Sequence, residues 1–363
     1  MKKMFKILMG MLLVILVLPF FTLPALGSEL NFAAEAVIPD NQINEQVSWF
    51  NLSVEPGDEQ TLEVNVRNDT DEELVIEVEI AAATTNLNGV VEYRVRDIER
   101  DSTLVHDLAD LVTAPETLVI PANEMVVLEL ELSVPREAFE GLIAGGIRLR
   151  AQESEEDIED ADAGMMIRNR FAHVIAITLQ TDEALTTMPD FVVNDAWADH
   201  LNARSVVFVN IQNTEPIFAN WISLNARVYR RGETVWHWNE VTAPRGMMFA
   251  PNSNMDFPIR LDGQPVETGQ YTACVTITSE AFEEEMVWED LCVDFFISVE
   301  DADALNDGDI EVTTFNSVWL IVILVVFAIL VLMLIIFAVK KKSSGNVNVS
   351  DVVEPIDDAG DID

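Results

Sequence analysis

Positive charge is scarce in this sequence, and lysine is missing from most of it. The 363 residues include 21 Lys and Arg against 63 Asp and Glu, a formal net charge of −42. Every lysine lies near one end of the chain, at Lys2, Lys3, Lys6 and residues 340–342, so the remaining 15 basic residues are all arginines. Six acids follow residue 350, which leaves 57 to face those arginines. A field of this sign repels nucleic acid and anionic polymers, so we expect no nucleic-acid partner.

The acidity favours adaptation to salty or alkaline surroundings over a specific ion-binding site. Arginine keeps its charge in alkaline surroundings where lysine begins to lose it. A calcium site is less favoured, because the sequence has no D-x-[DN]-x-[DN]-G loop and the acidic run at residues 153–162 is typical of a solvated linker. Adaptation of a secreted protein to salt or high pH and binding of divalent cations remain the two alternatives.

Histidine is also rare, and its positions form no recognisable metal or catalytic motif. The four residues are His106, His173, His200 and His237, and no H-E-x-x-H pairs two of them. A G-x-S-x-G elbow is absent. Acidic pairs such as Asp157 and Glu159 say nothing about glycosidase chemistry in a chain so rich in acids. The sequence therefore predicts a protein that is not an enzyme and has no cofactor or metal.

Long apolar runs are confined to the two ends. Residues 318–339 carry no charge and are followed by Lys340, Lys341 and Lys342. As a helix, this run spans roughly 33 Å at about 1.5 Å per residue, enough for a bilayer core of about 30 Å. The positive-inside rule then places residues 340–363 in the cytoplasm. A buried core helix is the alternative, although the run has no polar stripe.

The N-terminus has the pattern of a secretory signal peptide over residues 1–27. Lys2, Lys3 and Lys6 precede an apolar stretch at residues 7–18, and the small residues Ala25 and Gly27 follow. An uncleaved second anchor is the alternative. With cleavage, we expect a single-pass protein of the cell membrane whose residues 28–317 lie outside the cell.

Period-two alternation of apolar residues predicts an all-β ectodomain. It recurs over residues 62–66, 74–80 and 126–132, and again after an acidic segment over 206–211, 222–228, 257–261, 271–278 and 291–299. Only residues 101–112 have the spacing of a helix. The sequence predicts two immunoglobulin-like β-sandwiches in tandem, at residues 28–152 and 165–300. An acidic linker at 153–164 separates them, and a juxtamembrane linker at 301–317 precedes the membrane helix.

The two predicted sandwiches echo one another. Residues 64–68 (VNVRN) match 209–213 (VNIQN), and residues 121–125 (PANEM) match 251–255 (PNSNM). Asn68 and Pro121 are 53 residues apart, whereas Asn213 and Pro251 are 38 apart. The first half thus carries an insertion of about fifteen residues within segment 84–112. Binding sites often lie on such insertions, so we expect a first-domain ligand there.

Residues 84–93 of this insertion are the candidate ligand-binding site. Asn88-Gly89 favours the positive φ of a tight hairpin turn. The hydroxyls and amides of Thr84, Thr85, Asn86 and Asn88 suit sugar hydroxyls, and the ring of Tyr93 suits stacking. A hairpin connection without a ligand is the alternative.

Two further groups of residues carry expectations. The Trp236-His237-Trp238 run either stacks on a sugar or, as alternation on a strand favours, places one ring in the core and one outside. Cys274 and Cys292 fall in the strands of the last hairpin, and export permits oxidation, so we expect a disulfide between them, with Thr278 opposite Trp288. Two buried free thiols are the alternative.

The first half contains the short motifs IPDNQI at residues 38–43, FNLSVEPG at 50–57, ATTNLNGVVEY at 83–93 and GLIAGGI at 141–147. The second half contains NRFA at residues 169–172, NIQN at 210–213 and APNS at 250–253. These motifs resemble those of the WxL-interacting proteins of Gram-positive surfaces: the first set resembles their N-terminal domain and the second set their other ectodomain. The resemblance implies a peptidoglycan-binding first domain, a host- or matrix-binding second domain, and work beside WxL surface proteins. The extreme acidity departs from the family.

The chain is not itself a WxL protein, because none of its seven tryptophans is followed two residues later by leucine. The sequence therefore predicts a non-enzymatic, membrane-anchored surface protein that associates with peptidoglycan, with WxL-type surface proteins and potentially with host matrix protein. The alternatives are a wall-acting hydrolase and a host-matrix adhesin.

Overall fold

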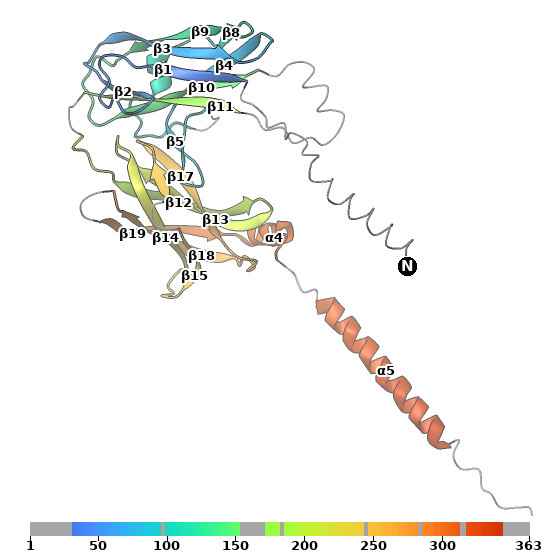
Figure 1. Ribbon diagram of the computed structural model, residues 1–363. Coiled ribbons are helices and arrows are strands. Elements are labelled where there is room, and N and C mark those ends of the chain that lie inside the picture. The colour runs from blue at the N-terminus through green and yellow to red at the C-terminus, as the bar shows by residue number, and fades with distance from the viewer. Residues whose placement is uncertain are drawn as a thin grey trace, which may run out of the picture.

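The computed structural model describes the backbone of residues 31–95, 99–152, 171–181, 185–242, 246–281, 285–312 and 317–343. The described chain is mostly β-strand and forms two β bodies, followed by a separate long helix (Figure 1). The prediction of an all-β protein is confirmed.

In the first body, two sheets enclose one apolar core. One sheet has the order β1 (Phe32–Val37), β3 (Glu59–Asn68), β9 (Met125–Ser133), β7 (Val112–Thr113). The facing sheet has the order β2 (Phe50–Ser53), β11 (Ala172–Gln180), β10 (Ile143–Ala151), β4 (Leu74–Ala82), β8 (Thr117–Ile120). Alternate residues point inward, as in β3, where Leu62, Val64 and Val66 are fully buried. Burial of these side chains drives the packing of the sheets.

The strand β11 corrects the predicted domain boundary. It pairs antiparallel with β10 and parallel with β2, and its Ile177 and Leu179 are buried in the first core. The predicted linker at 153–164 lies outside the described residues. It falls within a connection between two neighbouring strands of one sheet, not between the two sandwiches. The sequence reading failed because a change to acidic composition marks a loop without saying which domain the next strand joins.

The second body also packs two sheets around one core. One contains β12 (Phe191–Leu201), β13 (Arg204–Asn213) and β17 (Ser253–Arg260). The other has the order β15 (Trp236–Val241), β14 (Ala219–Arg230), β18 (Gly269–Ser279), β19 (Met286–Ile297), and β16 (Met247–Phe249) also pairs with β14. Tyr271 and Phe249 are among its largest fully buried side chains.

The last hairpin joins Cys274 to Cys292 in a disulfide across directly opposed positions of β18 and β19, with Cα atoms 4.1 Å apart. The predicted pairing of Thr278 with Trp288 is wrong. A bulge between Val275 and Ile277 shifts the register by one residue, so Thr278 lies opposite Val287.

Helices differ from the sequence prediction in two places. The helix predicted over residues 101–112 shrinks to α2 (Leu108–Leu111), since Asp101 and Asp107 instead accept hydrogen bonds from nearby backbone N–H groups, which favours turns and caps. The helix α4 (Val299–Gly308) covers the end of the predicted second sandwich and the first part of the predicted juxtamembrane linker, and its Ala302 and Leu305 are buried in the second core.

The long helix is α5 (Ser317–Ser343). Among the described residues, no helix is both long enough and apolar enough to cross a membrane.

Candidate functional site

The predicted ligand-binding segment lies at the junction of the two domains. Residues Thr84–Thr85 (β5) and Val91–Glu92 (β6) form a small hairpin, as the sequence predicted, and this hairpin contacts the start of β17 and β16. The Thr85 side chain is buried, and its Oγ1 accepts a hydrogen bond of 3.0 Å from the backbone N of Ala250. Ser253 Oγ donates to the carbonyl of Ala250, so the 2.8 Å bond between the two hydroxyls is donated by Thr85.

The turn of the hairpin is held from within. The side-chain oxygen of Asn86 accepts hydrogen bonds from the backbone N of Asn88 and Val90, while its Nδ2 donates to Glu92 at 2.7 Å. Gly89 has a φ of 68° and its carbonyl accepts from the backbone N of Met248 at 2.8 Å. A Cβ at Gly89 would lie 2.5 Å from the Met247 side chain, so only glycine fits here.

Tyr93 helps to seal the junction. Its ring packs with Ala83, Ala144 and Ala250, a small apolar cluster that draws on both domains. Burial raises the pKa of the Tyr93 hydroxyl. Of the five predicted ligand-binding residues, the structure thus gives Thr85, Asn86 and Tyr93 contacts within the protein, leaves Asn88 exposed, and places Thr84 on the wall of a cavity. The five residues do not share one exposed surface, because the insertion packs against the second domain, and ligand binding by them stays a prediction.

Asp101 fastens the rest of the insertion to the second domain. One of its carboxylate oxygens accepts from Gln212 Nε2 at 2.7 Å, and the other accepts from Asn254 Nδ2 at 2.9 Å. Asn252 Nδ2 donates to Thr103 Oγ1 at 3.2 Å. Sequence reasoning missed these partners, although Asn252 and Asn254 belong to the echoed segment after Pro251.

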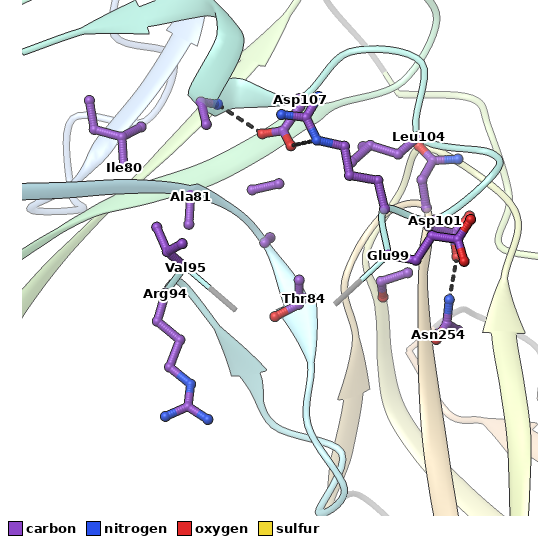
Figure 2. Close-up of a pocket in the computed structure, with 16 residues that line it drawn as sticks. Ile80, Ala81, Thr84, Arg94, Val95, Glu99, Asp101, Leu104, Asp107 and Asn254 are labelled. Carbon is purple, nitrogen blue, oxygen red and sulfur yellow. Dashed lines mark hydrogen bonds and ion pairs between the residues drawn. The ribbon is translucent and has the colours of Figure 1, made fainter. Parts of the chain in front are cut away.

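A cavity of about 210 Å³ opens beside this contact (Figure 2). Residues 80–83 give it a small apolar wall, and Thr84, Val95, Leu104 and the amide-bearing segment 252–254 of the second domain also line it. Its charged lining residues are Arg94, Glu99, Arg100, Asp101 and Asp107. In Figure 2 the Arg94 guanidinium points away from the hollow. A second cavity of about 370 Å³, which shares Leu104 and Asn252 with the first, is lined by residues of both domains as well.

The charges at the first cavity are largely engaged. Arg100 lies between Asp107 at 3.0 Å and Asp110 at 2.6 Å. The hydrogen bond from Arg100 lowers the pKa of Asp110, an effect that solvent screens because both groups are exposed. In the described part of the chain no group of three His, Cys, Asp or Glu could hold a metal ion. The arrangement offers hydrogen bonds and apolar contact, and no activated nucleophile.

The other sequence candidates lie elsewhere. Trp238 is buried and stacks on Tyr271 with ring centroids 5.4 Å apart, while Trp236 is 50% exposed, so one ring is in the core and one outside. His106 lies near Phe139, His173 contacts the carbonyl of Phe32, and His200 contacts the carbonyl of Leu305. These three histidines therefore lie in different parts of the structure and do not form one site.

Two family models match the chain, and together they cover both β bodies. Residues 32–151 match the model described as WxL Interacting Protein, peptidoglycan binding domain. Residues 162–307 match the model described as WxL Interacting Protein, host binding domain. The chain belongs to the WxL-interacting protein family. In this family member the strand β11, within the second matched region, completes the sheet of the peptidoglycan-binding domain.

Other comparisons add little. No curated protein matches the chain. Similar solved structures include a chaperone–tip adhesin complex of CFA/I fimbriae, with 11% identity over 73% of this chain and 100% of that chain and a TM-score of 0.29. The CupB2 chaperone of Pseudomonas aeruginosa has 9% identity over 64% and 91%, with a TM-score of 0.24. The E. coli chaperone DraB has 10% identity over 72% and 98%, with a TM-score of 0.26. At such scores nothing about function follows.

Proposed function

We propose that this protein is a membrane-anchored, non-enzymatic binding protein that holds peptidoglycan and WxL-type surface proteins near the cell membrane. The observation that carries the proposal is the match of both β bodies to domains named for binding, one of them for peptidoglycan. Immunoglobulin-like topology of both sandwiches, cleavage of the signal peptide and membrane insertion of residues 318–339 belong to the same proposal.

We place the peptidoglycan contact at the cavity between Thr84 and segment 252–254. The small apolar wall of the cavity suits the methyl groups of wall fragments, and the amides and hydroxyls around it suit their polar groups. With a formal charge of −42, long-range attraction to an anionic wall is excluded. Screening within about 8 Å at 0.15 M ionic strength removes most of the repulsion, so binding should hold or strengthen as salt rises.

Cosedimentation of the full-length protein in detergent with purified peptidoglycan, across a salt series, tests this proposal. Val95→Trp should reduce binding at every salt concentration, because Val95 is exposed on the cavity wall and an indole there would fill the opening. Val119→Trp is the matched control, since Val119 is exposed on the edge strand β8, away from the cavity. Equal binding by the two variants would remove the proposed site, and no binding by the parent at any salt would remove the wall-binding function.

The same incubation of the protein with peptidoglycan also tests the hydrolase alternative. Release of soluble muropeptides would overturn the non-enzymatic assignment.

Protease treatment of intact protoplasts tests the orientation, since an epitope placed after Asp363 should survive while the ectodomain is degraded. Capture of WxL proteins from native envelopes tests the partner.

A further inference from the structure

The outer face of the second domain's larger sheet has an unusual set of side chains. Along β14 the core-facing residues Leu224, Ala226 and Val228 are fully buried, so Asn225, Arg227 and Tyr229 point outward. The register places Trp236 opposite Tyr229 and Asn239 opposite Arg227 on β15. On the other side, Thr272 lies opposite Tyr229 and Cys274 lies opposite Arg227. These residues form one continuous surface, which we call the β14 face.

The aromatic part of the β14 face is available to a ligand. Trp236 is half exposed, and it pairs with Tyr229 next to a shift in the β14–β15 register between Val228 and Tyr229. The indole and the Tyr229 ring therefore offer adjacent apolar surfaces on an otherwise polar sheet. Apolar C–H faces of sugar rings are a natural partner for such rings.

Arg227 stands at the centre of the β14 face without a counter-charge. Its neighbours on the chain, Arg230 and Arg231, have carboxylates at 3.0 Å and 3.6 Å, in Glu267 and Asp294. No carboxylate among the described residues lies within 4.0 Å of the Arg227 guanidinium, although acids outnumber arginines almost fourfold in the ectodomain. A guanidinium pairs best with a carboxylate in a bidentate arrangement, so a ligand that carries one has a partner here.

Two amide groups beside Arg227 have unused hydrogen-bonding capacity. Asn225 Oδ1 and Asn239 Nδ2 are buried atoms for which the described residues supply no partner. One is an acceptor and the other a donor, and leaving each unsatisfied is unfavourable. A small rotation of either side chain toward the surface would let sugar hydroxyls, which both donate and accept, satisfy them.

The composition of the β14 face favours a carbohydrate over a protein partner. Protein interfaces have an apolar core, whereas here the aromatic pair is surrounded by threonine, asparagine and arginine, and Asp294 lies opposite Thr272 and accepts a hydrogen bond from its hydroxyl. The net charge of −42 disfavours a densely charged polyanion and tolerates isolated carboxylates on a largely neutral glycan. The disulfide of Cys274 and Cys292 links the strands β18 and β19 of this sheet covalently.

We propose that the β14 face binds a glycan with carboxylate-bearing sugars, with Arg227 pairing with one carboxylate and Trp236 stacking on a neighbouring ring. This site lies in the second domain and is independent of the interdomain cavity assigned to peptidoglycan. In intact wall the carboxyl group of muramic acid is amide-linked to the stem peptide, so the partner with free sugar carboxylates is a uronic-acid glycan of the host matrix.

Calorimetric titration of the full-length protein in detergent with three probes tests the site. The probes are a hyaluronan tetrasaccharide, wall glycan strands freed of their stem peptides, and chitotetraose as the neutral control. The hyaluronan probe should bind about tenfold or more tightly than chitotetraose, since a hydrogen bond to a charged group is worth about that factor. Binding of the wall strands in place of hyaluronan would contradict the host glycan as partner.

Two variants complete the test. Arg227→Gln should remove the preference for the acidic probe, and Trp236→Ala should weaken every probe by at least about tenfold. Trp221→Ala is the matched control: Trp221 is 52% exposed on the same strand, about 26 Å from Tyr229 at roughly 3.3 Å per residue. Equal affinity for chitotetraose, an unchanged preference in Arg227→Gln, or no binding of any probe would overturn the proposal. A loss of peptidoglycan cosedimentation in Val95→Trp but not in Arg227→Gln would keep the two sites distinct.

Discussion

The echo between the two halves has an explanation at the level of one side chain. Asn68 Nδ2 donates to the carbonyls of Glu72, Ile120 and Pro121. Asn213 Nδ2 donates to the carbonyls of Ile217 and Ala250 in the same way. Each asparagine ends a strand and fastens it to the turn that follows and to the segment before the echoed proline. The repeated asparagine is therefore structural.

We expect Asn68→Ala and Asn213→Ala each to lower the free energy of unfolding by about 2–4 kcal/mol, because buried carbonyls would lose their donor at about 1–3 kcal/mol each. Urea denaturation measures the change. Asn88→Ala is the control, since Asn88 is exposed and should change stability by less than about 0.5 kcal/mol. Equal stability of all three variants would contradict this role.

At the scale of elements, β11 decides where the first domain ends. It lies between β10 and β2 and supplies Ile177 and Leu179 to the core. A fragment of residues 28–152 lacks this strand, so two sheet edges and part of the core would be exposed. We expect that fragment to stay unfolded and a fragment of residues 28–181 to fold, as judged by amide dispersion in NMR spectra. A well-dispersed spectrum from residues 28–152 would contradict the assignment.

The disulfide acts on the last hairpin. Its cysteines are 18 residues apart, and closing a loop of that size stabilises a fold by roughly 3 kcal/mol in the chain-entropy model. The double variant Cys274→Ser, Cys292→Ser should lose about that much stability in denaturant unfolding of the second domain. Reductant should lower the free energy of unfolding of the parent by a similar amount and leave that of the double variant unchanged. Equal stability of the oxidised parent, the reduced parent and the double variant would mean that the bond contributes little.

For the whole molecule, the insertion of the first domain joins the two sandwiches. The backbone N of Met248 donates to Gly89, and the backbone N of Leu142 donates to Pro216, so two amides report on the junction. In Asp101→Ala, the side-chain amides of Gln212 and Asn254 lose their acceptor. The backbone amides of Met248 and Leu142 should then exchange hydrogen faster. Asp69→Ala, at an exposed ion pair with Arg67, is the control. Unchanged exchange in Asp101→Ala would show that Asp101 does not hold the junction.

Local pattern determined much of this protein from sequence alone. Alternating apolar residues identified most long strands, because one face of each strand must be buried, and the hairpin turn at Asn88-Gly89 follows from the backbone freedom of glycine. Family motifs spread along the chain pointed to the WxL-interacting proteins. The disulfide pairing also followed from the two cysteines facing each other in one hairpin.

Tertiary structure alone decided the rest. The assignment of β11 to the first sheet depends on pairing between distant segments, which periodicity does not encode. Thr85, Asn86 and Tyr93 have the composition of a sugar site, yet Thr85 and Tyr93 pack against the second domain and the side chain of Asn86 holds the hairpin turn. The interdomain cavity and the β14 face each combine residues far apart in sequence, so only the packed sheets bring their chemistry together.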